Sequence, residues 1–234
     1  MEPTAEVSIR SREVEYVRFY PDGINASLLS EIILCYQRVF EVYPWNEWKK
    51  CRACGTHWGI SERKIIDGLG GVHCGLPIEE YHPAGKIIES IKKSVSDDAS
   101  CWIAVQFGGK VVGFTWGRPI TAAQLAARLE ITKITEKMRA EFGGRTHIAF
   151  QHELGVLPEH QGRKIGKKLA ALRLADFKAR GLETAMFTTQ RTPPSVTYLW
   201  FSKDGYRVVF ESGGSTDRVL LARDITNYEI QVDM

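Results

Sequence analysis

The sequence has no long apolar run, no large excess of either charge and only five cysteines. A helix that crosses a bilayer needs about 20 consecutive apolar residues, so we expect no membrane span. The opening residues MEPTAEVSIR lack the apolar centre of a secretory signal. A net charge of +3 is too small to indicate a nucleic-acid partner, and an odd number of cysteines does not indicate a disulfide framework. We therefore expect a cytoplasmic protein with no nucleic-acid partner and no membrane partner.

Hydrophobic residues make up 44% of the chain and aromatic residues 10%, which is enough for a substantial core. Strand patterns and helix patterns follow one another, and no linker separates two large domains. This order predicts an α/β fold with a single mixed central sheet of about six to seven strands, flanked by helices. We expect one domain over residues 1–234, with a small cysteine-containing insert at 43–85 and a helical insert at 119–144.

Local signals predict where the elements lie. Strands are expected at 13–20, on both sides of Gly108-Gly109, and at 146–156, 184–190, 206–212 and 217–225. Helices are expected after a cap at Asn25 or Ser27, and at 86–94, 121–141, 164–180 and 195–205. The segment YPWNEWKKCRACGTHWG, residues 43–59, breaks every period and is expected to be irregular.

The strand at 146–156 separates polar from apolar side chains if it alternates regularly. One face would then carry His147, Gln151 and Glu153, which could line a cleft or relay a proton. The other face would carry Ile148, Phe150, His152, Leu154 and Val156.

The helix at 164–180 carries an apolar arc that would pack on the sheet. Its members are Ile165, Leu169, Leu172 and Phe177. Arg173 and Asp176 fall within the same arc and weaken the pattern.

The stretch VLPEHQGRKIGKKL, residues 156–169, crowds two glycines and four basic residues where the strand pattern becomes a helix pattern. The first amides of a helix lack intrahelical partners, and the helix dipole makes that end positive. Gly162 and Gly166 allow a ligand to approach the backbone. The combination favours binding of a phosphate or pyrophosphate, although it matches neither the P-loop nor the dinucleotide fingerprint.

This stretch resembles the acyl-CoA-binding motif of the GNAT N-acetyltransferase superfamily, Val-x-Pro-x-x-Arg/Gln-Gly-x-Gly-x-Gly/Ala. Val156, Pro158, Gln161, Gly162 and Gly166 match, and Lys164 stands where the middle glycine is usual. Downstream, Gly205 and Tyr206 match the closing signature of the family. The resemblance implies an acetyl-CoA site made by Leu154, Gly155, Val156, Gln161, Gly162, Arg163, Lys164, Ile165, Gly166 and Lys167.

The resemblance also implies roles in catalysis. Members of the family often carry a carboxylate where Glu153 stands, so Glu153 is the candidate base; the alternative is a half-exposed glutamate paired with a lysine. The backbone of residues 154–156 would stabilise the thioester oxygen. Phe201 occupies the position of the family's acidic tyrosine, and Tyr198 one turn earlier is the candidate substitute, unless it packs in the core. Pro194 replaces an asparagine that commonly opens this helix.

The resemblance predicts an acetyl-CoA-dependent N-acetyltransferase that moves an acetyl group directly to a primary amine. The identity of the amine is open, and the segment 121–141 would shape the acceptor site or form a homodimer contact. A non-catalytic acyl-CoA sensor or interaction module is the alternative, and Lys164, Pro194 and Phe201 favour it.

Three cysteines and two histidines have the spacing of metal ligands. Two residues separate Cys51 from Cys54, and Cys74 follows about 20 residues later. With His57 they would complete a structural zinc site, and His73 is the alternative fourth ligand. Buried thiols or a redox pair would give the same pattern.

The remaining cysteines and three tryptophans allow structural interpretations. Cys35 and Cys101 follow helix and strand periods and are expected in the core. Trp45, Trp48 and Trp58 surround the cysteine insert, where they would either wall a substrate pocket or form the insert's own small core.

Overall fold

A computed structural model describes residues 8–10, 14–20, 24–95, 99–106, 108–129, 136, 140, 145, 147–192, 194–211 and 217–227. Its strands are β1 (Ser8–Arg10), β2 (Val14–Arg18), β3 (Lys49–Cys51), β4 (His57–Trp58), β5 (Val72–His73), β6 (Leu76–Glu80), β7 (Ser100–Gln106), β8 (Val111–Thr121), β9 (His147–Val156), β10 (Thr184–Thr192), β11 (Arg207–Glu211) and β12 (Asp217–Asp224). Its α-helices are α1 (Ala26–Phe40), α2 (Arg63–Gly68), α3 (Ala84–Ser94), α4 (Ala122–Leu129), α6 (Ile165–Ala179) and α7 (Val196–Lys203).

One large sheet organises the molecule, with strand order β1-β2-β7-β8-β9-β10-β12-β11. Strands β9 and β10 run parallel, and the other neighbours are antiparallel. The predicted α/β fold with a single mixed sheet is therefore confirmed. Among the described residues the sheet has eight strands, because the three-residue edge strand β1 joins those that the sequence pattern predicted.

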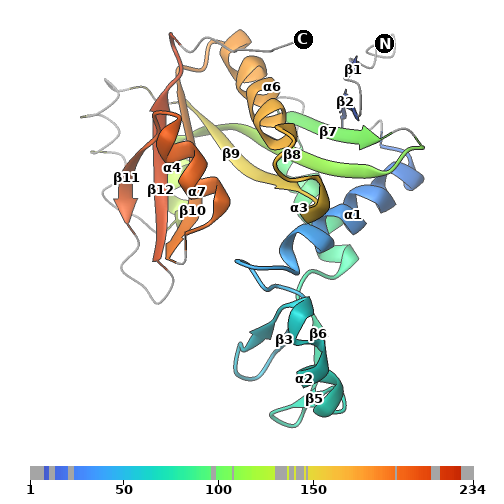
Figure 1. Cartoon of the computed structure of the whole chain (residues 1–234). Coiled ribbons are helices and arrows are strands. Elements are labelled where there is room, and N and C mark those ends of the chain that lie inside the picture. The colour runs from blue at the N-terminus through green and yellow to red at the C-terminus, as the bar shows by residue number, and fades with distance from the viewer. Residues whose placement is uncertain are drawn as a thin grey trace.

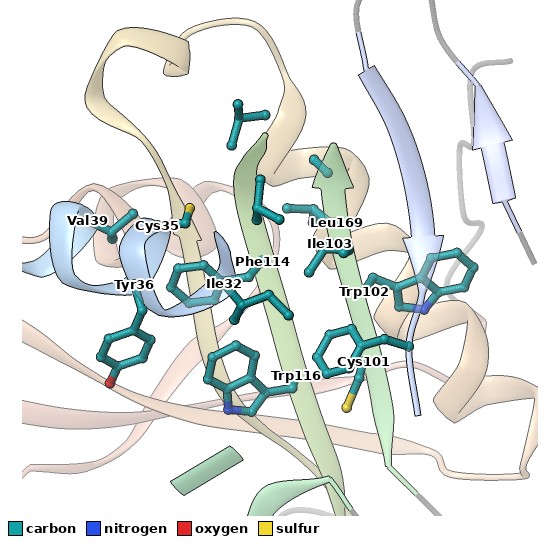
Figure 2. Close-up of a cluster of buried hydrophobic side chains, with 14 of the residues drawn as sticks. Ile32, Cys35, Tyr36, Val39, Cys101, Trp102, Ile103, Phe114, Trp116 and Leu169 are labelled. Carbon is teal, nitrogen blue, oxygen red and sulfur yellow. The ribbon is translucent and has the colours of Figure 1, made fainter. Parts of the chain in front are cut away.

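Helices cover both faces of this sheet (Figure 1). Helices α6 and α7 pack on one face around Phe177 and Phe201, and α4 packs on the other around Leu125. Helix α1 lies over β8 and β9, where Tyr36 stacks on Phe114 of β8 with ring centroids 5.4 Å apart (Figure 2). Within the described residues, no helix has both the length and the apolarity to cross a membrane.

The predicted local signals have visible physical causes. Asn25 caps α1, because its side-chain oxygen accepts a hydrogen bond of 2.8 Å from the Leu28 amide. Gly108 and Gly109 both adopt positive φ, at 103° and 87°, in the turn between β7 and β8. Helix α4 lies within the predicted helical insert, and most of residues 130–144 lie outside the described residues. Cys35 and Cys101 are buried in the core, as expected.

The cysteine-containing segment is ordered, which corrects the expectation of an irregular insert. Strands β4, β3, β6 and β5 form a second sheet in that order, and α2 packs beside it. This small sheet extends away from the large one, below α1 in Figure 1. Strands of two to five residues have too few alternating positions to give a periodic signal.

Of the two polar residues within the apolar arc of α6, Arg173 is buried and Asp176 is partly buried, and both are hydrogen-bonded. The Asp176 carboxylate accepts hydrogen bonds from the Ser100 hydroxyl at 2.6 Å and the Trp102 indole at 2.9 Å. It also pairs with Arg18 at 3.3 Å. Asp176 therefore joins α6 to β7 and β2, and it is a structural link rather than a defect in the arc.

We predict that Asp176→Ala lowers the free energy of unfolding by about 3 kcal/mol, because it leaves two donors and one cation without their acceptor. Chemical denaturation would measure the loss. Asp67→Ala is the matched control, since Asp67 makes an exposed ion pair of 3.8 Å with Arg63. The control should change stability by less than about 0.5 kcal/mol, and equal losses in the two variants would contradict the assigned link.

Candidate active site

Strands β9 and β10 separate partway along their length. They pair in parallel register only at Ala149–Ala185 and Phe150–Met186 among the described residues, although both strands continue further. Beyond these pairs the two strands form opposite walls of a cavity of about 300 Å³. Its lining residues from the two strands are Gln151, His152, Glu153, Leu154, Phe187, Thr188, Thr189 and Gln190.

A β-bulge at His152 turns β9 within this gap. Glu153 pairs with Trp116 while Gln151 pairs with Gly117, so one residue of β9 has no counterpart on β8. Gln151 consequently contacts α6, whereas Glu153 contacts α1. The expected common face for Gln151 and Glu153 is therefore wrong, because the bulge shifts the alternation by one residue.

Arg173 of α6 supplies the hydrogen bonds at the bulge. Its guanidinium donates to the carbonyl of Glu153 at 2.7 Å, to the carbonyl of Trp116 at 3.2 Å and to the side chain of Gln151. Gln151 in turn donates to the Tyr206 hydroxyl at 2.8 Å. Arg173 is only 2% exposed, so it holds the irregular backbone from inside the protein.

Glu153 has the properties of a proton acceptor near neutral pH. Burial raises the pKa of its carboxyl to about 7, and the Glu47 carboxylate nearby adds to the rise. The Tyr36 hydroxyl is hydrogen-bonded to it. His147, predicted for the same cleft, is exposed at the start of β9 and does not line the cavity.

A third wall of this cavity comes from α1 and from the two segments that lead into and out of the small sheet. Tyr36 and Phe40 of α1 line it, together with Trp45 and Glu47 before β3 and with Tyr81 and His82 after β6. The His82 Nε2 atom lies 2.7 Å from the Glu47 carboxylate, and the Tyr81 hydroxyl is hydrogen-bonded to the same carboxylate. We call the segments 45–48 and 81–82 the stem.

A second cavity of about 430 Å³ lies at the start of α6. Every residue predicted for the acetyl-CoA site lines it except Arg163. Residues that the motif did not predict also contribute: Val39, Val42, Tyr43, Pro44, Trp45, His160, Ser195, Val196, Thr197 and Trp200. We call this the α6 cavity, and the one between β9 and β10 the strand cavity.

The backbone before α6 explains two positions of the motif. Gly162 has φ +77°, a left-handed conformation that glycine adopts without strain. Lys164, at the position of the family's middle glycine, has φ +62° and precedes the first residue of the helix. The lysine therefore keeps a backbone conformation that glycine would adopt more easily.

Trp45, Leu154 and Thr197 line both cavities, so the two cavities meet at these side chains. Tyr198 packs against the cluster that includes Leu174 and Phe201 instead of lining either cavity. The prediction of Tyr198 as the acid is therefore corrected. Thr197 and Phe201 are the residues of α7 that face the strand cavity.

Three of the four predicted metal ligands come together in the small sheet. The Sγ atoms of Cys51, Cys54 and Cys74 lie with a ring nitrogen of His73 within 4.8 Å of one another. The His57 ring instead packs against Tyr81, with centroids 5.4 Å apart, so the choice of His57 over His73 is corrected. Cys74 adopts φ +50°, and this left-handed turn brings the adjacent His73 and Cys74 to the same point.

Some residues of the site carried only a weak signal in the sequence. Trp45 lines both cavities, as a wall of a substrate pocket would, whereas Trp48 and Trp58 belong to the small core of the insert. Each of the two interpretations of the three tryptophans therefore holds for part of them. Tyr36 occupies an apolar period of α1 that gave no reason to single it out. Glu47 and His82 are far apart in sequence, and only the pairing of β3 with β6 brings them together.

Comparison with known proteins agrees with this architecture. The family model of the acetyltransferase (GNAT) family matches residues 74–198, which is more than half of the chain. The chain therefore belongs to this family, and it is an N-acetyltransferase. The match begins at Cys74, so Cys51 and Cys54 lie outside it. No curated protein matches the sequence.

Three solved structures illustrate the likeness in fold. The PaiA N-acetyltransferase of Thermoplasma acidophilum, in complex with coenzyme A, is 17% identical with a TM-score of 0.53, covering 90% of this chain and 98% of its own. Aminoglycoside 6'-acetyltransferase type Ii is 14% identical with a TM-score of 0.51, covering 90% and 96%. The ribosomal-protein-S5-alanine acetyltransferase of Vibrio fischeri is 12% identical with a TM-score of 0.50, covering 95% and 99%.

We predict that Lys164→Gly raises the free energy of unfolding by about 1 kcal/mol, because glycine removes the strain of the left-handed conformation. Lys167→Gly is the matched control, since it removes the same charge from a residue inside α6 and should lower stability by about 1 kcal/mol. Denaturation of both variants would measure the difference. A loss of stability in Lys164→Gly would contradict the assigned backbone conformation.

Proposed function

We propose that the protein transfers an acetyl group directly from acetyl-CoA to a primary amine. The observation that carries this proposal is the meeting of the two cavities at Leu154, next to Glu153 and its raised pKa. The α6 cavity would hold the donor, and the strand cavity would hold the amine. A carboxylate able to accept a proton favours an enzyme over a non-catalytic acyl-CoA sensor.

The start of α6 suits the diphosphate of coenzyme A. Unpaired amides of the first helical turn and the positive end of the helix dipole attract phosphate oxygens. Lys164 and Lys167 add formal charge to the same cavity. Gly166 lines the same cavity without a side chain, and a Cβ atom there would lie 3.4 Å from Val156, which also lines it.

The gap between β9 and β10 suits the acyl end of the donor. The Leu157 amide donates to Val112 of β8, and amides alternate in direction along an antiparallel strand. We infer that the amides of Leu154 and Val156 point away from β8, toward the gap. These amides are the candidates to bind pantetheine and to stabilise the negative charge that develops on the thioester oxygen.

Glu153 would act as the general base, directly or through one water molecule. The amine must lose a proton before its nitrogen has a lone pair for attack. The nitrogen then bonds to the thioester carbon, the carbon–sulfur bond breaks, and coenzyme A leaves as a thiolate. The second proton that the nitrogen loses as the amide forms passes to this thiolate, directly or through water, and gives the free thiol. Because a thiolate is a good leaving group, this scheme does not require an acid at Tyr198 or Phe201.

We propose the segment 43–85 as an insert within one GNAT domain, and we propose a structural zinc ion within it. Three thiols and one imidazole are the donor set that zinc prefers, and four protein ligands leave no open position for catalysis. The amine itself is not defined by the fold, since the similar structures carry names that refer to different acceptors.

We predict that Glu153→Gln lowers kcat/KM by about 10² to 10⁴-fold while acetyl-CoA still binds. Release of free thiol would be followed with acetyl-CoA and a panel of amines containing spermidine, kanamycin and an alanine-initiated peptide. Below pH 7 the wild-type carboxyl is protonated, so its contribution to kcat/KM should rise about tenfold per pH unit and level off above pH 7.

The variant should lack this rise in kcat/KM with pH. Glu89→Gln, on the exposed surface of α3, is the matched control and should retain wild-type activity. Undiminished turnover by Glu153→Gln would remove the base assignment. Donor binding without transfer to any amine would favour the sensor.

We also predict that Gly162→Asp raises the Kd for coenzyme A by at least about tenfold, because a carboxylate at this end of the helix repels the diphosphate. Calorimetry would measure the affinity. Gly181→Asp is a close control: Gly181 has φ +75° and lies just beyond the other end of α6, so the backbone strain is similar. Its Kd should stay within about twofold of wild type, and an equal effect of both substitutions would contradict the site.

A further inference from the structure

We propose that a zinc ion bound by Cys51, Cys54, His73 and Cys74 holds the stem in place as the acceptor-binding wall of the strand cavity. This inference rests on the proposed function, which assigns the strand cavity to the amine. It assigns Glu47, Tyr81 and His82 of the stem, which line the strand cavity and not the α6 cavity, a role in acceptor recognition and none in binding coenzyme A.

Two tight turns present the four ligands. In the turn between β3 and β4, the Cys51 amide donates to Thr56 at 2.8 Å and the Gly55 amide donates to Cys51 at 3.0 Å, which folds Cys54 back toward Cys51. In the turn between β5 and β6, Cys74 and Gly75 both have positive φ, at 50° and 76°. Glycine or asparagine normally fills such a position, so a cysteine there points to a use for its thiol.

The distances between ligand atoms fit a tetrahedral ion. With zinc–sulfur bonds of about 2.3 Å and zinc–nitrogen bonds of about 2.0 Å, a sulfur and a nitrogen ligand lie about 3.5 Å apart. The His73 Nδ1 atom lies 3.6 Å from the Cys54 Sγ and 3.3 Å from the Cys74 Sγ. The Cys51 Sγ lies within 4.8 Å of each of these three atoms, so the four ligand atoms form one cluster.

The insert has too small a core to hold this arrangement by packing. Its buried hydrophobic residues are Cys51, Trp58 and Ile66, with Trp48 and Ile78 partly buried beside them. Five large hydrophobic side chains remain exposed on the same segment: Tyr43, Ile65, Leu69, Val72 and Leu76. The small sheet and α2 lie between Lys49 and Glu80, and units below about 40 residues usually need a metal or disulfides, so that metal binding supplies folding free energy.

A continuous ladder connects the ion to the strand cavity. Cys51 pairs with Ile78, and Lys49 pairs with Glu80, along β3 and β6. The Tyr81 amide then donates to the Trp48 carbonyl at 3.1 Å, which extends the pairing into the stem.

The next pair along the ladder faces the cavity. It is formed by Glu47 and His82, whose side chains lie 2.7 Å apart and line the strand cavity. From Cys51 to Glu47 the paired segment spans about 13 Å. The zinc ion would fix the end at Cys51, and the end at Glu47 is part of the acceptor-binding wall.

The first experiment tests the ion with matched histidine variants. The full chain, purified with reductant, should contain one zinc per molecule by elemental analysis. His73→Ala should lose it, whereas His57→Ala should keep it, because His57 lies outside the cluster. Cobalt substitution of the wild type should give the absorption of a tetrahedral thiolate site.

The second experiment tests the link to the acceptor wall. Removal of zinc by a chelator should speed hydrogen exchange at the amides of Trp48 and Tyr81, while the Kd for coenzyme A stays within about twofold. With a panel amine that the wild type acetylates, His73→Ala should raise the KM for the amine about tenfold and leave the KM for acetyl-CoA unchanged.

Other outcomes would overturn the inference. A disulfide in the cluster with no uptake of added zinc would exclude the ion, and zinc without any effect on exchange in the stem would exclude the link. Failure of the proposed function is distinguishable: the chain would then bind zinc and protect the stem, yet release no thiol with any amine in the panel.

Discussion

The buried guanidinium of Arg173 is the constraint on which the site depends. A bulged strand that separates from its neighbour loses hydrogen-bond partners, and buried carbonyls without partners are costly. Arg173 donates to the carbonyls of Glu153 and Trp116 and to Gln151, so the irregular part of β9 is satisfied from α6. The same helix starts at the α6 cavity, so one element both supports the gap and contributes the candidate diphosphate site.

The two halves of the site have different origins in the chain. The α6 cavity is built mainly from one continuous stretch, from the end of β9 to the first turn of α6, to which the end of α1, residues 42–45 and α7 add further lining. The strand cavity draws on α1, the stem, β9, β10 and α7, which are widely separated in sequence. This difference explains why a motif could predict one half while the other half needed coordinates.

Patterns that depend on neighbours in the chain predicted the structure well. The cap at Asn25, the paired glycines before β8 and the bounds of α6 all follow from local backbone chemistry. Errors arose where tertiary contacts decide. The bulge at His152 depends on Arg173, and the choice between His57 and His73 depends on the left-handed turn at Cys74. Tyr198 was misplaced because the orientation of α7 is set by packing.

The ends of the insert lie side by side, since the Tyr81 amide reaches the Trp48 carbonyl. The chain therefore leaves the part of the protein built around the large sheet and returns to it at nearly the same point. Segments with adjacent ends can be lengthened, shortened or exchanged without rerouting the surrounding fold. Replacement of the segment between Trp48 and Tyr81 during evolution would accordingly change which nucleophile is accepted and leave the α6 cavity unaltered.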